Sequence, residues 1–145
     1  MHDHDNCRFY NRVKDFTVED LAAFHGHLGS YLVVGYRIGR YVRAHFCNDP
    51  FLLHATICCS AKPPESCIAD GVQIGSGCTL GKRNIEVVQS SDLHCEFEAN
   101  GKKLHVVPRP EIVRASGVSS EADAERFAEE IARLQDDRIF DVYNL

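Results

Sequence analysis

The sequence predicts a single α+β domain, in which a long N-terminal helix and a C-terminal amphipathic helix pack against an antiparallel or mixed sheet. Three patterns predict it: helical spacing of apolar residues in the first third, short apolar strands in the middle, and an amphipathic helix near the end. With 145 residues, 44% of them hydrophobic and 26% charged, the chain suits one domain with an ordinary core. We expect residues 1–145 to form that domain, with residues 1–10 flexible and 136–145 as a C-terminal tail.

The first helix is predicted by "FTVEDLAAFHG". Thr17 is a suitable N-cap, and Asp20 lies three residues later, where it can complete a capping box. Gly26 is a suitable end for this helix because glycine adopts the left-handed conformation of a C-cap. The sequence therefore predicts a short helix that stops at the glycine between two histidines.

A longer helix should follow, from His27 or Leu28 to Phe46. Its apolar stripe includes Gly35 and Gly39, each of which costs about 0.8–1 kcal/mol relative to alanine inside a helix. Two such glycines on one face indicate that another backbone segment packs closely there.

The middle of the chain predicts short strands around one helix. "FLLHATICC", residues 51–59, is apolar and β-branched, as in a buried strand. After the prolines of "AKPPES", helical spacing begins at Cys67, and glycines end it by residue 77. Three further strands are predicted at residues 84–89, 93–99 and 103–107.

Turn and capping residues complete the predicted order of elements. Asn100-Gly101 predicts a hairpin turn because both residues tolerate positive φ. The segment 108–114 is a candidate extension of the sheet. "SSEADAERFAEEIARLQ" predicts the last helix, capped by Ser119 or Ser120 and with acidic residues at its positive end.

Charge and hydropathy exclude several classes of function. The net charge of −5 and pI near 5.9 argue against a nucleic-acid-binding protein, and Arg37, Arg40 and Arg43 come closest to a local basic face. No apolar run approaches the roughly 20 residues that span a bilayer. The start, "MHDHDNCRFY", lacks the apolar core of a secretory signal. We therefore expect no nucleic acid, no membrane, and a cytoplasmic location.

Seven cysteines and eight histidines direct attention to metal chemistry. An odd number of cysteines without a signal peptide disfavours a disulfide framework. His25 and His27 lie two residues apart, which on a helix would point them about 200° away from each other. They can face one partner only if the backbone bends at Gly26.

A bent His-x-His pair and a cysteine from elsewhere could supply three ligands to zinc or a related metal and leave a fourth position open. Cys67 is one candidate, because the positive end of a helix would lower the pKa of its thiol. Cys78 is another, in a glycine-rich turn where its sulfur need not be buried. Two alternatives stay open. In the first, one of the two histidines lies in the core and the other on the surface. In the second, a thiolate–imidazolium pair makes Cys67 the nucleophile of an enzyme.

The glycine-rich turn does not fit a P-loop, because Ser76 and Arg83 occupy positions that need glycine and Ser/Thr. A weaker anion site that uses backbone amides and Lys82 stays open. Asp70 and Gln73 follow Cys67 by about one helical turn, where they could contact a substrate or hold the ligands in place.

Two stretches, "FHGHLGSYLVVGYRIGRY" and "ESCIADGVQIGSGCTLGKRNI", resemble in this order the E subunit family of formylmethanofuran dehydrogenase, FmdE. The matched segments cover residues 20–45 and 62–90. The resemblance implies an α+β core that tends to form a homodimer around a metal-binding cleft. Carried over by position, it implies the metal ligands His25, His27, Cys67 and Cys78, and places Asp70, Gln73, Thr79 and Lys82 at further positions, as contacts to substrate or supports of the ligands.

The chain departs from the family pattern twice. Gly29-Ser30 stands where the family commonly has Cys-Pro, so one thiolate is lost. The chain also ends in an amphipathic helix and "DDRIFDVYNL" where many members carry a cysteine-rich zinc finger, so it resembles a free-standing core domain.

The expected function is therefore that of a metal-binding protein, holding zinc or another divalent metal such as nickel and linked to a molybdenum- or tungsten-pterin enzyme system. One alternative is an accessory protein that docks on an oxidoreductase through the arginine face or the acidic C-terminal helix. The other is the thiol-dependent enzyme at Cys67.

Overall fold

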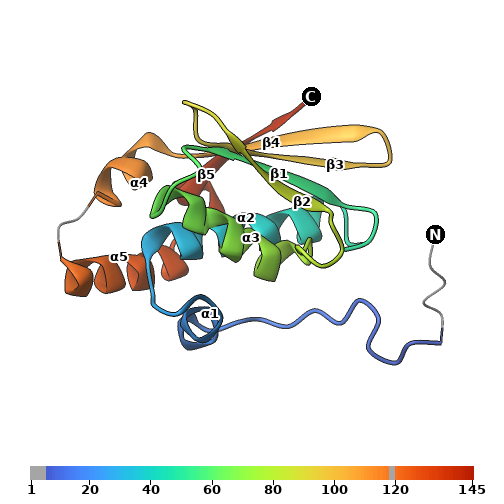
Figure 1. Ribbon diagram of the computed structural model, residues 1–145, viewed down its shortest axis with the longest axis horizontal. Helices are drawn as coiled ribbons and strands as arrows, with labels where there is room; N and C mark the ends of the chain where they lie inside the picture. The colour runs from blue at the N-terminus through green and yellow to red at the C-terminus, as the bar shows by residue number, and fades with distance from the viewer. Residues whose placement is uncertain (1–5, 118–119) are drawn as a thin grey trace.

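The computed structural model describes residues 6–117 and 120–145, which form a mixed five-stranded sheet with helices against one face (Figure 1). The strand order is β2-β1-β3-β4-β5; β1 and β2 are parallel, and the other neighbours are antiparallel. The strands are β1 (His54–Cys59), β2 (Ile85–Gln89), β3 (His94–Ala99), β4 (Lys102–Pro108) and β5 (Phe140–Asn144). The helices are α1 (Val18–His25), α2 (Ser30–His45), the 3₁₀ turn η1 (Glu65–Cys67), α3 (Ile68–Ser76), α4 (Pro110–Ala115), α5 (Glu121–Arg133) and α6 (Asp136–Ile139). The predicted α+β class is confirmed.

Helix α1 begins and ends as its sequence predicts. The Thr17 hydroxyl accepts a hydrogen bond from the Asp20 amide, and the Asp20 carboxylate accepts one from the Thr17 amide. Gly26 ends the helix in the left-handed region, at φ 107°. Helix α2 begins at Ser30, later than predicted, because the chain needs residues 26–29 to turn into the new direction; Gly29 is still extended, at φ −140°.

The two helices beneath the sheet, α2 and α3, touch through their backbones (Figure 1). A Cβ added at Gly35 would lie 2.1 Å from the Ile68 carbonyl oxygen, and one added at Gly71 would lie 2.0 Å from the Leu32 oxygen. Further along both helices, Gly39 and Gly75 approach each other in the same way. Because later residues of α2 contact later residues of α3, the two helices run parallel. The backbone segment predicted against Gly35 and Gly39 is therefore α3.

The sheet presents alternate residues to this helical layer. Ile57 of β1, Phe97 of β3 and Val106 of β4 are buried in the core, while the residues between them lie on the opposite face. The hairpin between β3 and β4 turns at Asn100 and Gly101, at φ 53° and 76°, as predicted.

Two expectations for the later part of the chain are wrong. Residues 108–114 do not extend the sheet beyond Pro108, because Pro110 opens helix α4, a position where its missing N–H costs nothing. Residues 136–145 are not a tail: α6 buries Ile139, and β5 pairs with β4, with Val142 opposite Val106. Of the flexible segment expected at residues 1–10, residues 1–5 lie outside the described part. Ser120 caps α5, while Ser119 also lies outside that part.

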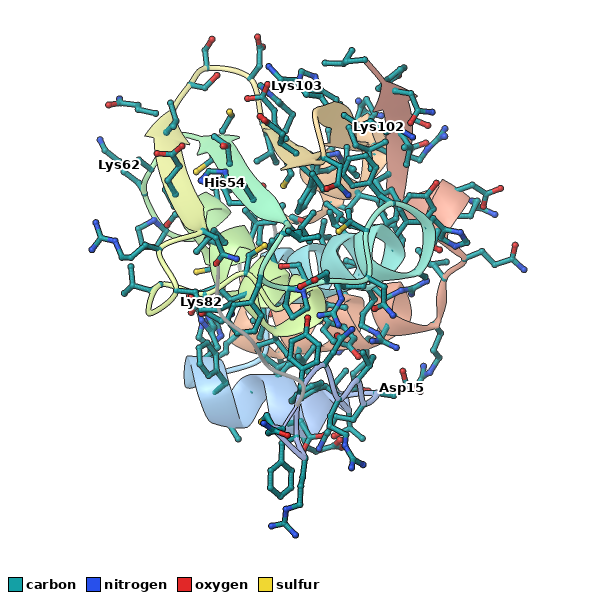
Figure 2. The ribbon with its side chains drawn as sticks, turned by 90° about the vertical axis from the view of Figure 1, so that its right-hand side faces the viewer. Asp15, His54, Lys62, Lys82, Lys102 and Lys103 are labelled. Carbon is teal, nitrogen blue, oxygen red and sulfur yellow. The ribbon has the colours of Figure 1, made fainter. Side chains whose placement is uncertain are left out.

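The arginines of α2 form hydrogen bonds and ion pairs with other parts of the chain, so the expectation of a basic face is corrected. Arg37 donates to the carbonyl oxygen of Ile131 and pairs with Asp136 at 2.9 Å, so it holds α2 to the C-terminal helices. Arg43 is buried and donates to the Ser76 oxygen at the end of α3. Arg40 pairs with Asp15 of the N-terminal segment, labelled in Figure 2. Among the described helices, none has the length and apolarity that crossing a membrane requires.

Replacing Gly71 with alanine should destabilise the protein. The added Cβ meets backbone of α2, so it can be relieved only by separating the helices, and overpacking of this kind costs about 1–3 kcal/mol or more. That exceeds the gain of about 1 kcal/mol that alanine brings to a helix. Urea unfolding should show a lower free energy of unfolding for Gly71→Ala. Gly81→Ala is the matched control, because a Cβ there meets nothing within 4 Å; equal losses in both variants would contradict the prediction.

Candidate metal centre

A pocket of about 140 Å³ lies where α2 and α3 begin. His25, His27, Gly29 and Cys67 line it, together with apolar atoms such as those of Ala124 on α5. The parallel helices explain this grouping, because their backbone contact brings both first turns to the same end of the layer. Three of the predicted metal ligands therefore share one pocket.

His25 is held by a carboxylate. Its Nδ1 lies 2.5 Å from Oδ2 of Asp70, one turn into α3, and the His25 side chain is only 11% exposed. Because an ionised carboxylate can only accept, Nδ1 carries the proton of this hydrogen bond, and in a neutral ring Nε2 then keeps its lone pair. A histidine fixed in this tautomer by a carboxylate is the usual form of a metal-binding histidine.

His27 reaches the same pocket because Gly26 turns the backbone off the helical path. The ring centroids of His25 and His27 are 5.0 Å apart. A Cβ at Gly29 would lie 3.3 Å from Cε1 of His27, so the glycine leaves room for the ring. Within the described residues, the ligand atoms of His25, His27 and Cys67 do not all lie within 4.8 Å of one another. Binding of an ion here therefore requires side-chain rotation.

The pKa of Cys67 is not lowered, and this expectation is wrong. Cys67 does precede the first turn of α3, but burial, followed by the charge of Asp70, raises the pKa of its thiol. The loss of hydration outweighs the backbone hydrogen bond that acts in the opposite direction. A metal ion would have to displace the thiol proton to bind here.

Cys78 lies away from this pocket. Its side chain is fully buried and donates a weak hydrogen bond to the Leu53 oxygen, so the expectation of an unburied sulfur is wrong. Burial also raises the pKa of the Cys78 thiol. Its backbone amide is held by the Ser76 hydroxyl, which fixes the turn after α3.

Three other predicted residues hold this turn. Gln73 accepts from the Leu80 amide, and Lys82 donates to the Thr79 hydroxyl at 3.0 Å and to the Gly77 oxygen. Figure 2 labels Lys82 beside this turn. Thr79 and Lys82 also line an open hollow of about 480 Å³, with Arg40 and Arg43. The structure thus separates the eight predicted site residues into two groups: His25, His27, Cys67 and Asp70 at the start of α3, and Gln73, Cys78, Thr79 and Lys82 nearer its end.

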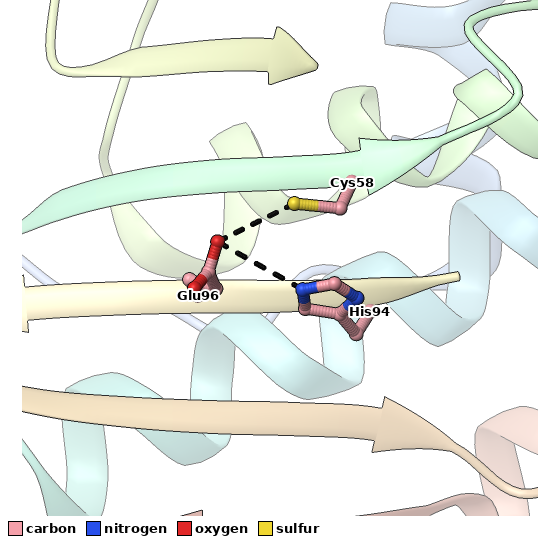
Figure 3. Close-up of side chains that lie close together, drawn as sticks. All are labelled: Cys58, His94 and Glu96. Carbon is pink, nitrogen blue, oxygen red and sulfur yellow. Dashed lines mark hydrogen bonds and ion pairs between the residues drawn. The ribbon is translucent and has the colours of Figure 1, made fainter. Parts of the chain in front are cut away.

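A second group of ligand-type side chains lies on the sheet, where no site was predicted. Cys58, His94 and Glu96 have ligand atoms that all lie within 4.8 Å of one another (Figure 3). Burial, with a smaller contribution from Glu96, raises the pKa of Cys58 to about 11. A hydrogen bond from His105 lowers the pKa of Glu96. The polar alternation of β3 and β4 was visible in the sequence, but the order of the strands was not.

Comparison with known protein families finds a family model that matches the chain. The family model described as "FmdE, Molybdenum formylmethanofuran dehydrogenase operon" matches residues 24–145, which include every residue of the His/Cys pocket. No curated protein matches the chain. Because the match spans far more than half of the sequence, and because the histidines, the cysteine and the parallel glycine helices all lie within it, the chain belongs to the FmdE family.

Proposed function

We propose that this protein is a cytoplasmic metal-binding protein that takes zinc, or another divalent metal such as nickel, in the pocket at the start of α2 and α3. One observation carries the proposal: His25, His27 and Cys67 line one pocket, and the Asp70 carboxylate lies 2.5 Å from Nδ1 of His25, which leaves Nε2 as the ring nitrogen for an ion. The family is named for a molybdenum formylmethanofuran dehydrogenase operon, which supports a role beside such an enzyme.

The donor set suits the proposed metals. Two imidazole nitrogens and one thiolate are ligands that zinc and nickel accept, whereas magnesium and calcium prefer oxygen. Three protein ligands leave one position of a tetrahedral ion open, as in catalytic zinc sites. Gly29 has no side chain to fill that position. A bound ion of this kind would supply Lewis-acid chemistry to a ligand in the open position.

The protein's own groups have separate tasks in this proposal. Asp70 keeps the Nδ1 proton of His25 in place and so directs Nε2 to the ion. Leu32 and Ala124 line the same pocket with apolar atoms and limit the access of water. Cys67 supplies charge, since loss of its thiol proton gives a thiolate that offsets part of the charge of the ion.

The accessory-protein alternative has less support than its sequence pattern suggested. Arg37, Arg40 and Arg43 are paired within the chain, so they do not offer a free basic face. Exposed carboxylates on α5, such as Glu125 and Glu129, remain as an acidic surface on which a partner could dock. The expected homodimer stays a prediction.

Removal of a pocket ligand should remove one metal ion. In a His2→Ala/His4→Ala background, which eliminates binding by the "HDHD" sequence, we expect His25→Ala, His27→Ala and Cys67→Ser each to lower zinc content by about one ion per chain. Elemental analysis of protein equilibrated with zinc and gel-filtered measures this. His45→Ala is the control, because His45 is an exposed histidine at the far end of α2. Pocket variants that keep the zinc content of the control would refute the proposal.

Loss of the Asp70 carboxylate should weaken binding without removing the site. Asp70→Asn keeps the shape of the side chain but no longer fixes the proton on Nδ1 of His25, and such changes typically cost about 10- to 100-fold in metal affinity. Competition titration with a chromogenic chelator gives the affinity. The exposed Asp137→Asn should match wild type. An unchanged affinity in Asp70→Asn would show that the carboxylate has no part in binding.

The thiol-enzyme alternative predicts a reactive Cys67, and the structure predicts the reverse. Because burial raises the pKa of Cys67, less of its thiol is ionised at pH 7 than of an ordinary cysteine, and its alkylation rate should still be rising above pH about 8.5. Mass spectrometry of metal-free protein treated with iodoacetamide gives the rate of each cysteine. The exposed Cys7 is the internal reference. A Cys67 that reacts faster than Cys7 at pH 7 would favour the enzyme.

A further inference from the structure

The side-chain cluster on the sheet is assembled by strand pairing. Ile57, Cys95, Phe97 and Val106 face the core, so Cys58, His94, Glu96 and His105 lie on the opposite face. Cys58 is directly opposite His94 across β1 and β3, and Glu96 is directly opposite His105 across β3 and β4. Three adjacent strands therefore fix the cluster, and no long loop is involved.

The distances within the cluster are close to those around a metal ion. Glu96 Oε2 lies 3.4 Å from Sγ of Cys58 and 3.8 Å from Nε2 of His94 (Figure 3). A tetrahedral zinc ion with bonds of about 2.0–2.3 Å holds its ligand atoms roughly 3.3–3.7 Å apart. Small rotations of the three side chains would reach that spacing. In the His/Cys pocket, by contrast, the three ligand atoms are more widely spread.

His105 supports one of these ligands. Its Nε2 lies 2.6 Å from Oε1 of Glu96, the carboxylate oxygen that faces away from Cys58 and His94. A hydrogen bond to one oxygen leaves the other free to bind an ion, and carboxylate ligands are commonly held in this way. His94 and His105 also line an open hollow of about 630 Å³ beside α4, which gives an ion and a further ligand access from solvent.

We propose that Cys58, His94 and Glu96 bind a divalent metal ion of the zinc type on the outer face of the sheet, with His105 as a positioning residue and the fourth position open to water or a small ligand. The mixture of sulfur, nitrogen and oxygen donors selects zinc, cobalt or nickel over magnesium and calcium. On binding, the thiol of Cys58 loses its proton to solvent, and the thiolate, imidazole and carboxylate each donate one lone pair. The site is independent of the pocket.

The test uses cobalt(II), because a thiolate bound to cobalt gives a charge-transfer absorption band. The background protein is the full chain with His2→Ala, His4→Ala and Cys67→Ser, stripped with a chelator, so that neither the N-terminal histidines nor the pocket cysteine contributes. We expect this protein to give the band with about one cobalt per chain. Cys58→Ser should abolish it. His94→Ala should weaken binding by more than about 100-fold, since loss of a ligand exceeds the roughly 10- to 100-fold loss expected for His105→Ala.

His54→Ala is the matched control, because His54 lies on the same strand and face as Cys58 but is not part of the cluster. It should leave the titration unchanged, and circular dichroism should show the same fold in all variants. A background protein without the band, or a band that survives Cys58→Ser, would overturn the proposal. If the Cys58→Ser variant does not fold, the His94→Ala variant tests the proposal instead. Equal cobalt affinities of His94→Ala and His54→Ala would also overturn the proposed site. The reciprocal background, Cys58→Ser with Cys67 intact, reports on the pocket alone.

Discussion

The backbone contact between α2 and α3 is the constraint on which the pocket depends. Glycines on both helices let two parallel backbones approach to a distance that any side chain would prevent. Each glycine costs about 1 kcal/mol of helix propensity, and the packed interface offsets that cost. Because the helices are parallel, their first turns lie together, so His25 and His27 before α2 meet Cys67 and Asp70 at the start of α3.

The two candidate metal sites rest on different kinds of support. The pocket takes its ligands from the last residue of α1, the linker before α2 and the last residue of η1, so its geometry follows from how these segments pack. The cluster of Cys58, His94 and Glu96 takes its ligands from two paired strands, so its geometry follows from register. The first has the better-held histidine, and the second has the more compact set of ligand atoms. Both give the chain sulfur and nitrogen donors without a disulfide or a cysteine-rich motif.

Local signals in the sequence were sufficient for much of the fold and for selecting three residues, His25, His27 and Cys67, that line one pocket in the structure. The capping box at Thr17, the turn at Asn100 and the glycines of α2 each depend on near neighbours or on one face of one helix. The burial of Cys78 and the raised pKa of Cys67 depend on what surrounds them in space, and the sequence carries no direct record of that. Predicting the cluster on the sheet requires the strand order, which places β3 between β1 and β4. Hydrophobic alternation does not encode that order. Strand β5 was missed because its apolar residues follow a short polar stretch that resembles a tail.

The glycine contact also divides the pocket into a fixed wall and an adjustable one. Cys67, the N-cap of α3, belongs to the fixed wall, because α3 cannot slide along α2 while their backbones touch. His27 lies on the four-residue linker between α1 and α2, with Gly26 at one end and Gly29 at the other. Backbone rotation is least restricted at glycine, so adjustment concentrates in this linker. In the proposed site, the part of the pocket free to adjust to an ion would therefore be the histidine linker, while the thiol of Cys67 stays with α3.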